Sequence, residues 1–266
     1  MGVFPFTLSF AGGPAARFPF IMDGRPVEGI SCAVSSRSAG NMVYSAGETN
    51  PARDVLYRFL GLEPRRVFAC TQVHSRDVLV VDRDSPNRGP RGDGLVSRDP
   101  LVCLSVTVAD CLPVFLHDTE GGAFGLVHSG WKGTGIVLRA LRLMGERWKV
   151  RPEAVAAILG PCLRSCCYRV GEERARAFEA EFGGDGPLGP VTREAPIPGE
   201  PGRAFFLDLQ AANARLLAAE GVRNIAVCGD CTFTDERLGS FRREGVRDNP
   251  GDPSLYTRMA VLVGRF

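Results

Sequence analysis

The feature that most constrains the fold is an apolar run, residues 101–108, that ends abruptly at Asp110 and Cys111. Within it every second position is a larger apolar residue: Val102, Leu104, Val106 and Val108 alternate with Cys103, Ser105 and Thr107. This period of two, rich in β-branched side chains, predicts a buried strand. Because burying a charged carboxylate costs several kcal/mol, we expect Asp110 and Cys111 to face a cleft where the strand ends.

A second apolar run, residues 123–127, ends at His128 and leads through the glycine-rich segment 130–135 into a helical pattern. Val137, Leu141, Met144 and Trp148 recur at spacings of four, three and four, which places them on one helix face. The glycine turn fits an anion site or a plain tight turn equally well. The stretch therefore predicts a strand, a thiol, a strand, an imidazole, a turn and a helix.

A thiol and an imidazole at two strand ends are compatible with two chemistries. One is a thiolate nucleophile, Cys111, with His128 as its base. The other is a metal site, and sulfur with nitrogen donors favours zinc. A catalytic zinc needs a third protein ligand, which His74 could supply because it also ends an apolar run, residues 66–73. Residue types alone still favour a buried thiol and hydrogen-bonded histidines, and they predict that His117 is a surface turn residue.

The order of elements predicts a layered α+β fold in one domain, residues 1–266, because strands outnumber helices without a strict βαβ alternation. We predict short strands within residues 1–30, then strands at 29–36, 66–73, 78–82, 101–108, 123–128, 154–159, 222–228 and 259–263. The predicted helices cover residues 51–60, 135–148, 171–182 and 209–220. Three segments are predicted as loops: 84–94, a mobile loop at 183–203 and a long polar loop at 229–254.

Composition excludes several classes of protein. The formal net charge is +2 and the arginines are scattered, so we expect neither a nucleic-acid nor a membrane partner. No run approaches the roughly 20 apolar residues of a membrane span, and the N-terminus lacks the pattern of a signal peptide. Nine cysteines without a secreted framework predict reduced thiols and a cytoplasmic protein. We expect a monomer.

The remaining cysteines include a C-x-x-C pair, Cys228 and Cys231. With Cys162 and Cys166 it could form a four-thiolate zinc or iron–sulfur site. A lone C-x-x-C pair is weak evidence, so ordinary buried thiols are the favoured interpretation and a redox pair is the least favoured. The sequence does not decide whether these four residues or Cys167 bind anything.

Blocks in the same order along the chain resemble those of the YfiH/laccase-domain family, once called multicopper polyphenol oxidases. The blocks are residues 71–74, 93–96, 107–114, 128–134, 160–162 with 166–168, 208–213, 231–232 and 240–243. The resemblance runs from about residue 30 to the C-terminus. Its members are described as zinc-dependent purine nucleoside phosphorylases that also deaminate adenosine. The resemblance implies a four-layer α/β/β/α sandwich with mixed, largely antiparallel sheets.

The resemblance also implies a set of site residues. The family's zinc ligands correspond to His74, Cys111 and His128, so Zn²⁺ is the expected cofactor. The expected substrates are phosphate and a purine nucleoside: adenosine, inosine, guanosine or methylthioadenosine. The candidate substrate-binding residues are Arg37, Asn41, Gln72, Arg242 and Arg243. The loop around Arg37 is shorter than in the family, and Phe241 replaces the usual tyrosine.

Asp110 is the candidate catalytic residue, either as a general base or as a group that orients the site. Three alternative functions belong to other classes. A cysteine hydrolase would use Cys111 and His128. A copper-dependent phenol oxidase would need roughly ten His/Cys donors for three copper centres, which three histidines cannot supply. A zinc-stabilised partner protein would bind the metal without turning over a nucleoside.

Overall fold

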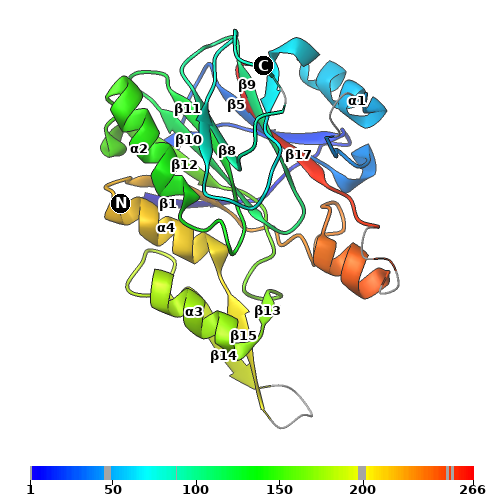
Figure 1. Ribbon diagram of the computed structural model, residues 1–266, viewed down its shortest axis with the longest axis vertical. Coiled ribbons are helices and arrows are strands. Elements are labelled where there is room, and N and C mark those ends of the chain that lie inside the picture. The colour runs from blue at the N-terminus through cyan, green and yellow to red at the C-terminus, as the bar shows by residue number, and fades with distance from the viewer. Residues whose placement is uncertain (1, 45–48, 88, 197–201, 250–251, 253–254) are drawn as a thin grey trace.

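The computed structural model describes residues 2–44, 49–87, 89–196, 202–249, 252 and 255–266. Two β-sheets form its centre (Figure 1). The larger has the order β1 (Gly2–Phe6), β16 (Asn224–Cys228), β12 (Val155–Leu159), β10 (Leu112–Asp118), β11 (Phe124–Ser129), β8 (Gly94–Ser97) and β7 (Val78–Val80). The smaller has the order β2 (Ala15–Phe18), β5 (Ser31–Ser35), β17 (Met259–Gly264), β9 (Cys103–Val108) and β6 (Val67–Ala69). Antiparallel pairing predominates, with parallel pairs such as β1–β16 and β6–β9.

The two sheets share a core that follows from the alternation in their strands. The larger apolar residues of the 102–108 run join a buried cluster that also contains Phe115 of β10 and Phe124 of β11. Cys103 points the other way, into a separate cluster. The predicted period of two is therefore confirmed, because one face of β9 meets the opposite sheet and the other face meets a helix layer.

Helices cover both outer faces (Figure 1). On the larger sheet these are α2 (Ile136–Trp148) and α4 (Leu209–Ala219), with α3 (Glu172–Phe182) packed beside α4. On the smaller sheet α1 (Pro51–Leu60) packs its buried residues against the Cys103 cluster. Asn50 caps α1 by accepting from the Ala52 amide at 3.0 Å, and Gly61 ends it with φ 69°. The predicted α/β/β/α layering is confirmed.

Smaller elements complete the described chain. A hairpin joins β3 (Ile21–Met22) to β4 (Arg25–Pro26) through Asp23 and Gly24, whose φ angles of 50° and 77° suit the Asp-Gly turn. Three short 3₁₀ turns occur: η1 (Arg37–Ala39), η2 (Pro64–Arg66) and η3 (Pro152–Ala154). No described helix is both long enough and apolar enough to cross a membrane.

One prediction was wrong at the centre of the fold. His117 is not a surface turn residue: it is buried in β10, a central strand between β11 and β12 that the sequence analysis missed. Its ring packs 5.3 Å from that of Phe20. Pro113 lies at the second position of β10. A proline is tolerated near the start of a strand because the ladder there does not require its missing N–H.

Two predicted loops contain regular structure. The 183–203 segment includes β14 (Thr192–Pro196), which pairs with β15 (Arg203–Leu207), and β15 pairs in turn with β13 (Arg169–Val170). Residues 197–201 of that segment lie outside the described residues. The 229–254 segment includes a π-helix, η4 (Phe241–Asp248). Residues 250, 251, 253 and 254 of this segment lie outside the described residues. Ser240 begins this helix by accepting from the Arg243 amide at 3.1 Å, a capping interaction that hydrophobic periodicity does not detect.

Candidate metal centre

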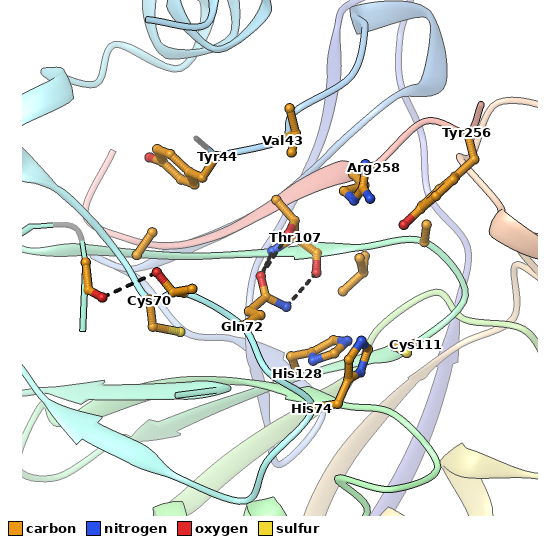
Figure 2. A pocket seen from close by; sticks show the side chains of 15 residues that line it. Val43, Tyr44, Cys70, Gln72, His74, Thr107, Cys111, His128, Tyr256 and Arg258 are labelled. Atoms are coloured by element: carbon orange, nitrogen blue, oxygen red, sulfur yellow. Dashed lines mark hydrogen bonds between the residues drawn. The ribbon is translucent and has the colours of Figure 1, made fainter. Parts of the chain in front are cut away.

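A cavity of about 330 Å³ lies where the two sheets meet, beside the end of β9. Its floor carries His74, Cys111 and His128, and its opposite side carries Tyr256 and Arg258 (Figure 2). This volume is at the lower end of the range typical of small-molecule sites. The cavity therefore combines a cluster of metal-type donors with room for a small ligand.

The three predicted donors come from three separate segments and converge. His74 follows β6, Cys111 lies between β9 and β10, and His128 lies in β11. One potential ligand atom of each lies within 4.8 Å of the other two, and the imidazole centroids are 4.9 Å apart. The structure thus brings together residues that the sequence places far apart.

Asp93, fully buried before β8, organises both histidines. Its carboxylate accepts from the backbone amides of His74 at 3.0 Å and Ser75 at 2.6 Å, and from Nδ1 of His128 at 2.9 Å. These bonds hold His74 at φ 58°, an unfavourable backbone angle for a non-glycine residue. With Nδ1 of His128 bonded to Asp93, its Nε2 is left for a metal, as is common for metal-binding histidines. The sequence analysis did not assign Asp93, although a carboxylate beside an apolar strand is the signal that had singled out Asp110.

The protonation of the site follows from its charges. Burial opposes ionisation of the Cys111 thiol, but the charge and hydrogen bond of His128 outweigh it and lower the pKa of Cys111 to about 7. Burial also opposes protonation of His128, yet the Cys111 thiolate and Asp93 raise the pKa of His128 to about 10. Asp93 is ionised, because its bonds to His128 and Ser75 overcome burial and lower its pKa to about 2. Both pKa shifts favour a thiolate beside an imidazolium over a neutral thiol and imidazole.

The donor set fits a zinc ion. One thiolate and two imidazoles are a known catalytic zinc set, which leaves one coordination position open. The surrounding chain leaves space beside the sulfur only because residue 130 is glycine: a Cβ there would lie 2.9 Å from Sγ of Cys111. Sulfur and nitrogen ligands suit a transition metal such as zinc better than a hard cation such as magnesium.

Asp110 lies beside the triad but faces away from the cavity. Its φ of 85° reverses the chain after β9, so Cys111 turns toward the cavity. The buried carboxylate accepts from Oγ1 of Thr232 and from the Arg242 amide, both at 2.6 Å. Burial raises the pKa of Asp110 despite these bonds. The geometry suits a residue that fixes the backbone before Cys111.

Gln72 lines the cavity, yet its amide group is already bonded to Thr107. Its Oε1 accepts from the Thr107 amide at 2.7 Å and its Nε2 donates to the Thr107 carbonyl at 2.9 Å. Asn41 holds the segment before β17: its side chain donates to the Tyr256 carbonyl at 3.3 Å and accepts from the Arg258 amide at 3.1 Å. Both residues therefore position parts of the cavity wall.

The predicted arginines are not brought together at the triad. Arg37 lines a different pocket, with Glu236 and Arg237. Arg242 is half-buried, and its guanidinium donates to the Arg169 carbonyl at 3.1 Å. Arg243 is buried and donates to backbone carbonyls, including that of Thr232 at 2.6 Å. Arg243 thus organises the chain around η4.

The cation that does line the cavity, Arg258, was missed by the sequence analysis, as were the aromatic residues Tyr44 and Tyr256. Arg258 lies 4.2 Å from the centroid of the Tyr256 ring, which in turn packs at 5.1 Å against Phe241. The sequence did contain an indication of Arg258, because this arginine immediately precedes the buried strand β17. Polar residues at the ends of buried strands had identified the triad in the same way.

Comparisons with known proteins place this chain in a family. Residues 43–261 match the family described as multi-copper polyphenol oxidoreductase laccase. A protein of Corynebacterium glutamicum named purine nucleoside phosphorylase is 35% identical over 198 residues, covering 73% of this chain and 75% of the relative. YlmD of Geobacillus stearothermophilus, also named a purine nucleoside phosphorylase, is 31% identical over 222 residues, covering 79% and 76%.

Solved structures extend the likeness to the fold. The crystal structure of YlmD superposes with a TM-score of 0.74 at 27% identity, covering 93% of this chain and 96% of that one. YfiH of Bacillus licheniformis superposes with a TM-score of 0.69 at 21% identity, covering 89% and 93%. The second likeness concerns the fold alone.

Proposed function

This chain belongs to the multi-copper polyphenol oxidoreductase laccase family, and we propose that it is a zinc-dependent purine nucleoside phosphorylase that also deaminates adenosine. One observation carries the proposal: a single cavity holds the convergent donors His74, Cys111 and His128 on one side and Arg258 on the other (Figure 2). The names of the relatives support the same activity.

The cavity offers a distinct place for each part of the substrates. The planar guanidinium of Arg258 suits bidentate binding of phosphate. The ring of Tyr256, supported by Phe241, provides an aromatic surface for a purine. The donors on the floor then face the ribose and base from the opposite side. We propose adenosine, inosine, guanosine and methylthioadenosine as the substrates to test.

Phosphorolysis joins a phosphate oxygen to C1′ of the ribose and breaks the bond from C1′ to the purine nitrogen. The base leaves with the bonding electron pair and takes up a proton. Arg258 orients the phosphate for this attack. Deamination in the same cavity replaces the 6-amino group of adenosine with an oxygen from water and releases ammonia.

A zinc ion held by His74, Cys111 and His128 would supply Lewis-acid chemistry and hydroxide at neutral pH. The chain contributes the geometry that such chemistry requires. Asp93 fixes the orientation of His128 and the backbone of His74. Asp110, held by Thr232, fixes the turn that presents Cys111. We therefore propose that Asp110 is a positioning residue rather than an acid or base.

The proposal is tested by metal analysis followed by product assays. Purified protein should bind about one zinc ion in the cavity, and Cys111→Ser or His128→Ala should remove it. Zinc-loaded protein should release ribose 1-phosphate from inosine or guanosine only when phosphate is present. Cys228→Ala, which removes a buried thiol away from the cavity, is the matched control. Absence of ribose 1-phosphate at every phosphate concentration would exclude phosphorolysis.

The role of Asp110 is tested separately with Asp110→Asn. A positioning residue should leave zinc bound and lower kcat by roughly 10–100-fold, as when a hydrogen-bonded neighbour of a metal ligand is lost. A fall of roughly 10²–10⁴-fold with a changed pH profile would instead indicate an acid–base group. Loss of zinc would identify Asp110 as essential for ligand binding.

One alternative has an observation in its favour. The Cys111 thiolate, His128 and Asp93 are connected in the order of a cysteine hydrolase triad. In such an enzyme, alkylation of Cys111 would abolish activity and chelators would leave it intact. Our proposal expects chelators to abolish turnover and added zinc to restore it. The older copper oxidase interpretation is not favoured, because three histidines cannot supply a laccase-type donor set.

A further inference from the structure

A second group of thiols lies outside the cavity. The sulfur atoms of Cys166, Cys167 and Cys231 all lie within 4.8 Å of one another, and none of the three forms a disulfide. We propose that these three thiols bind a thiophilic divalent cation of the Zn²⁺ class, at a site separate from the His74–Cys111–His128 centre.

The backbone brings these thiols together without help from a metal. Cys162 and Cys231 form an isolated parallel bridge, and the Thr232 amide donates to the Cys162 carbonyl at 3.0 Å. A tight turn then places the neighbouring thiols, because the Cys167 amide donates to the Arg164 carbonyl at 2.8 Å. The guanidinium of Arg164 donates across to the Gly229 carbonyl at 2.8 Å. A preformed site loses less conformational freedom when an ion binds.

The spacing of the sulfurs suits one ion. With metal–sulfur bonds of about 2.3 Å, tetrahedral geometry places sulfur atoms about 3.8 Å apart. The sulfur atoms lie within 4.8 Å of one another, so the cysteine side chains must draw together by up to about 1 Å when an ion binds. A disulfide needs a far shorter separation, about 2.05 Å. Three sulfurs also leave one position for water, and the exposure of Cys166 gives an ion a path from solvent.

The charges around Cys231 favour its thiolate form. Burial opposes ionisation, but the backbone amides of Arg164, Phe233 and Thr234 point at the sulfur and lower the pKa of Cys231. Amide donors of this kind commonly surround the sulfur ligands of metals. Three thiolates with a divalent cation carry a net charge of −1, and the guanidinium of Arg164 offsets it. Burial raises the pKa of Cys166 and of Cys167, so an ion must displace their protons as it binds.

This assignment differs from the four-thiolate site that the C-x-x-C pair suggested. Cys162 and Cys228 are fully buried, and neither belongs to the group of three close sulfur atoms. Cys228 instead lies 3.3 Å from a carboxylate oxygen of Asp230. Only Cys231 of the pair joins the group, and the vicinal Cys166 and Cys167 complete it.

The first experiment counts zinc with Zn²⁺ as the only added ion. Wild-type protein should bind about two zinc ions per chain. Both Cys111→Ser and the double variant Cys166→Ser/Cys167→Ser should bind about one, and the control Cys228→Ala should bind about two. A wild-type ratio of one that falls to zero in Cys111→Ser would overturn the proposal. Because Cys111→Ser isolates the second site, the outcome does not depend on the proposed enzyme activity.

The second experiment distinguishes a metal from a disulfide by alkylating the native zinc-loaded protein and locating the labelled cysteines by mass spectrometry. A chelator alone should expose Cys166 and Cys167 to the reagent. Two results would overturn the proposal: immediate labelling before chelation, or protection that only a reductant removes. Cobalt-loaded Cys111→Ser should also retain sulfur-to-metal charge-transfer absorption, and the further loss of Cys166 and Cys167 should abolish it.

Discussion

Gly130→Ala tests the cavity triad directly, because one added methyl group would meet the Cys111 sulfur. The new Cβ would lie 2.9 Å from Sγ of Cys111, whereas ordinary contact begins near 3.4 Å. The sulfur must therefore retreat by at least about 0.5 Å. A zinc site tolerates departures of only about 0.2 Å in its ligand distances. The displacement thus exceeds what the site can absorb without losing or distorting a ligand.

We expect Gly130→Ala to weaken zinc binding at least as much as loss of a hydrogen-bonded neighbour does, roughly 10–100-fold. Gly130 does not have a positive φ angle, so alanine introduces no backbone strain and the fold should persist. Overpacking should cost roughly 1–3 kcal/mol of the free energy of unfolding. Competition with a chromophoric chelator measures the affinity, and thermal unfolding of the metal-free protein measures the stability.

Gly145→Ala is the matched control. Gly145 lies within α2, where an added Cβ would meet only the Val150 carbonyl at 3.6 Å. Alanine there should leave zinc affinity unchanged and stabilise the helix by about 1 kcal/mol. If Gly130→Ala binds zinc as tightly as the wild type while remaining folded, Cys111 is not a ligand in this conformation and the triad is wrong.

Three further predictions concern the surroundings of the site. Asp93→Asn should weaken zinc binding roughly 10–100-fold, measured by chelator competition, because His128 loses its charged partner; unchanged affinity would contradict that role. His117 is buried, and burial lowers its pKa in the folded protein. As the pH falls below about 6.5, the pKa of histidine in an unfolded chain, His117 is therefore protonated in the unfolded protein before it is protonated in the folded one. The stability advantage of wild type over His117→Gln in denaturant titrations should therefore shrink between about pH 7 and pH 5, and a constant difference would refute this. Gln72→Leu should cost roughly 1–3 kcal/mol in denaturant titrations, because the Thr107 amide loses its acceptor; a loss in turnover alone would favour a substrate contact.

Cys111 and His128 became candidate ligands because strand ends are visible in a sequence, and the family resemblance then favoured the triad over buried, hydrogen-bonded side chains. Cys111 and His128 each follow an apolar run, and a thiol or imidazole in that place is unusual enough to be noticed. Their convergence with His74 could not be worked out from spacing, since it depends on how β6, β9 and β11 are arranged in two different sheets. The family resemblance supplied that arrangement, and the structure agrees with it.

The sequence analysis missed other features for specific physical reasons. β10 was missed because Pro113 and His117 break the expected pattern, although a proline at the second position of a strand and a buried histidine are both compatible with a central strand. Arg258 was missed because its importance depends on β17 placing it opposite the triad. The arginines chosen in its stead were judged by resemblance alone, and Arg243 shows that the terminal nitrogens of a buried arginine can be directed at backbone carbonyls rather than at a ligand.

The triad straddles the junction between the two sheets: His74 follows a strand of the smaller sheet, His128 belongs to the larger, and Cys111 lies on the link between them. Any sliding of one sheet across the other changes the distances among the three donors. Close-packed interiors transmit such displacements over several residues. The zinc affinity of the proposed site should therefore depend on how well the core is packed. Substitutions at Phe115 or Leu104, which touch no ligand, should register as altered affinity before they register as unfolding.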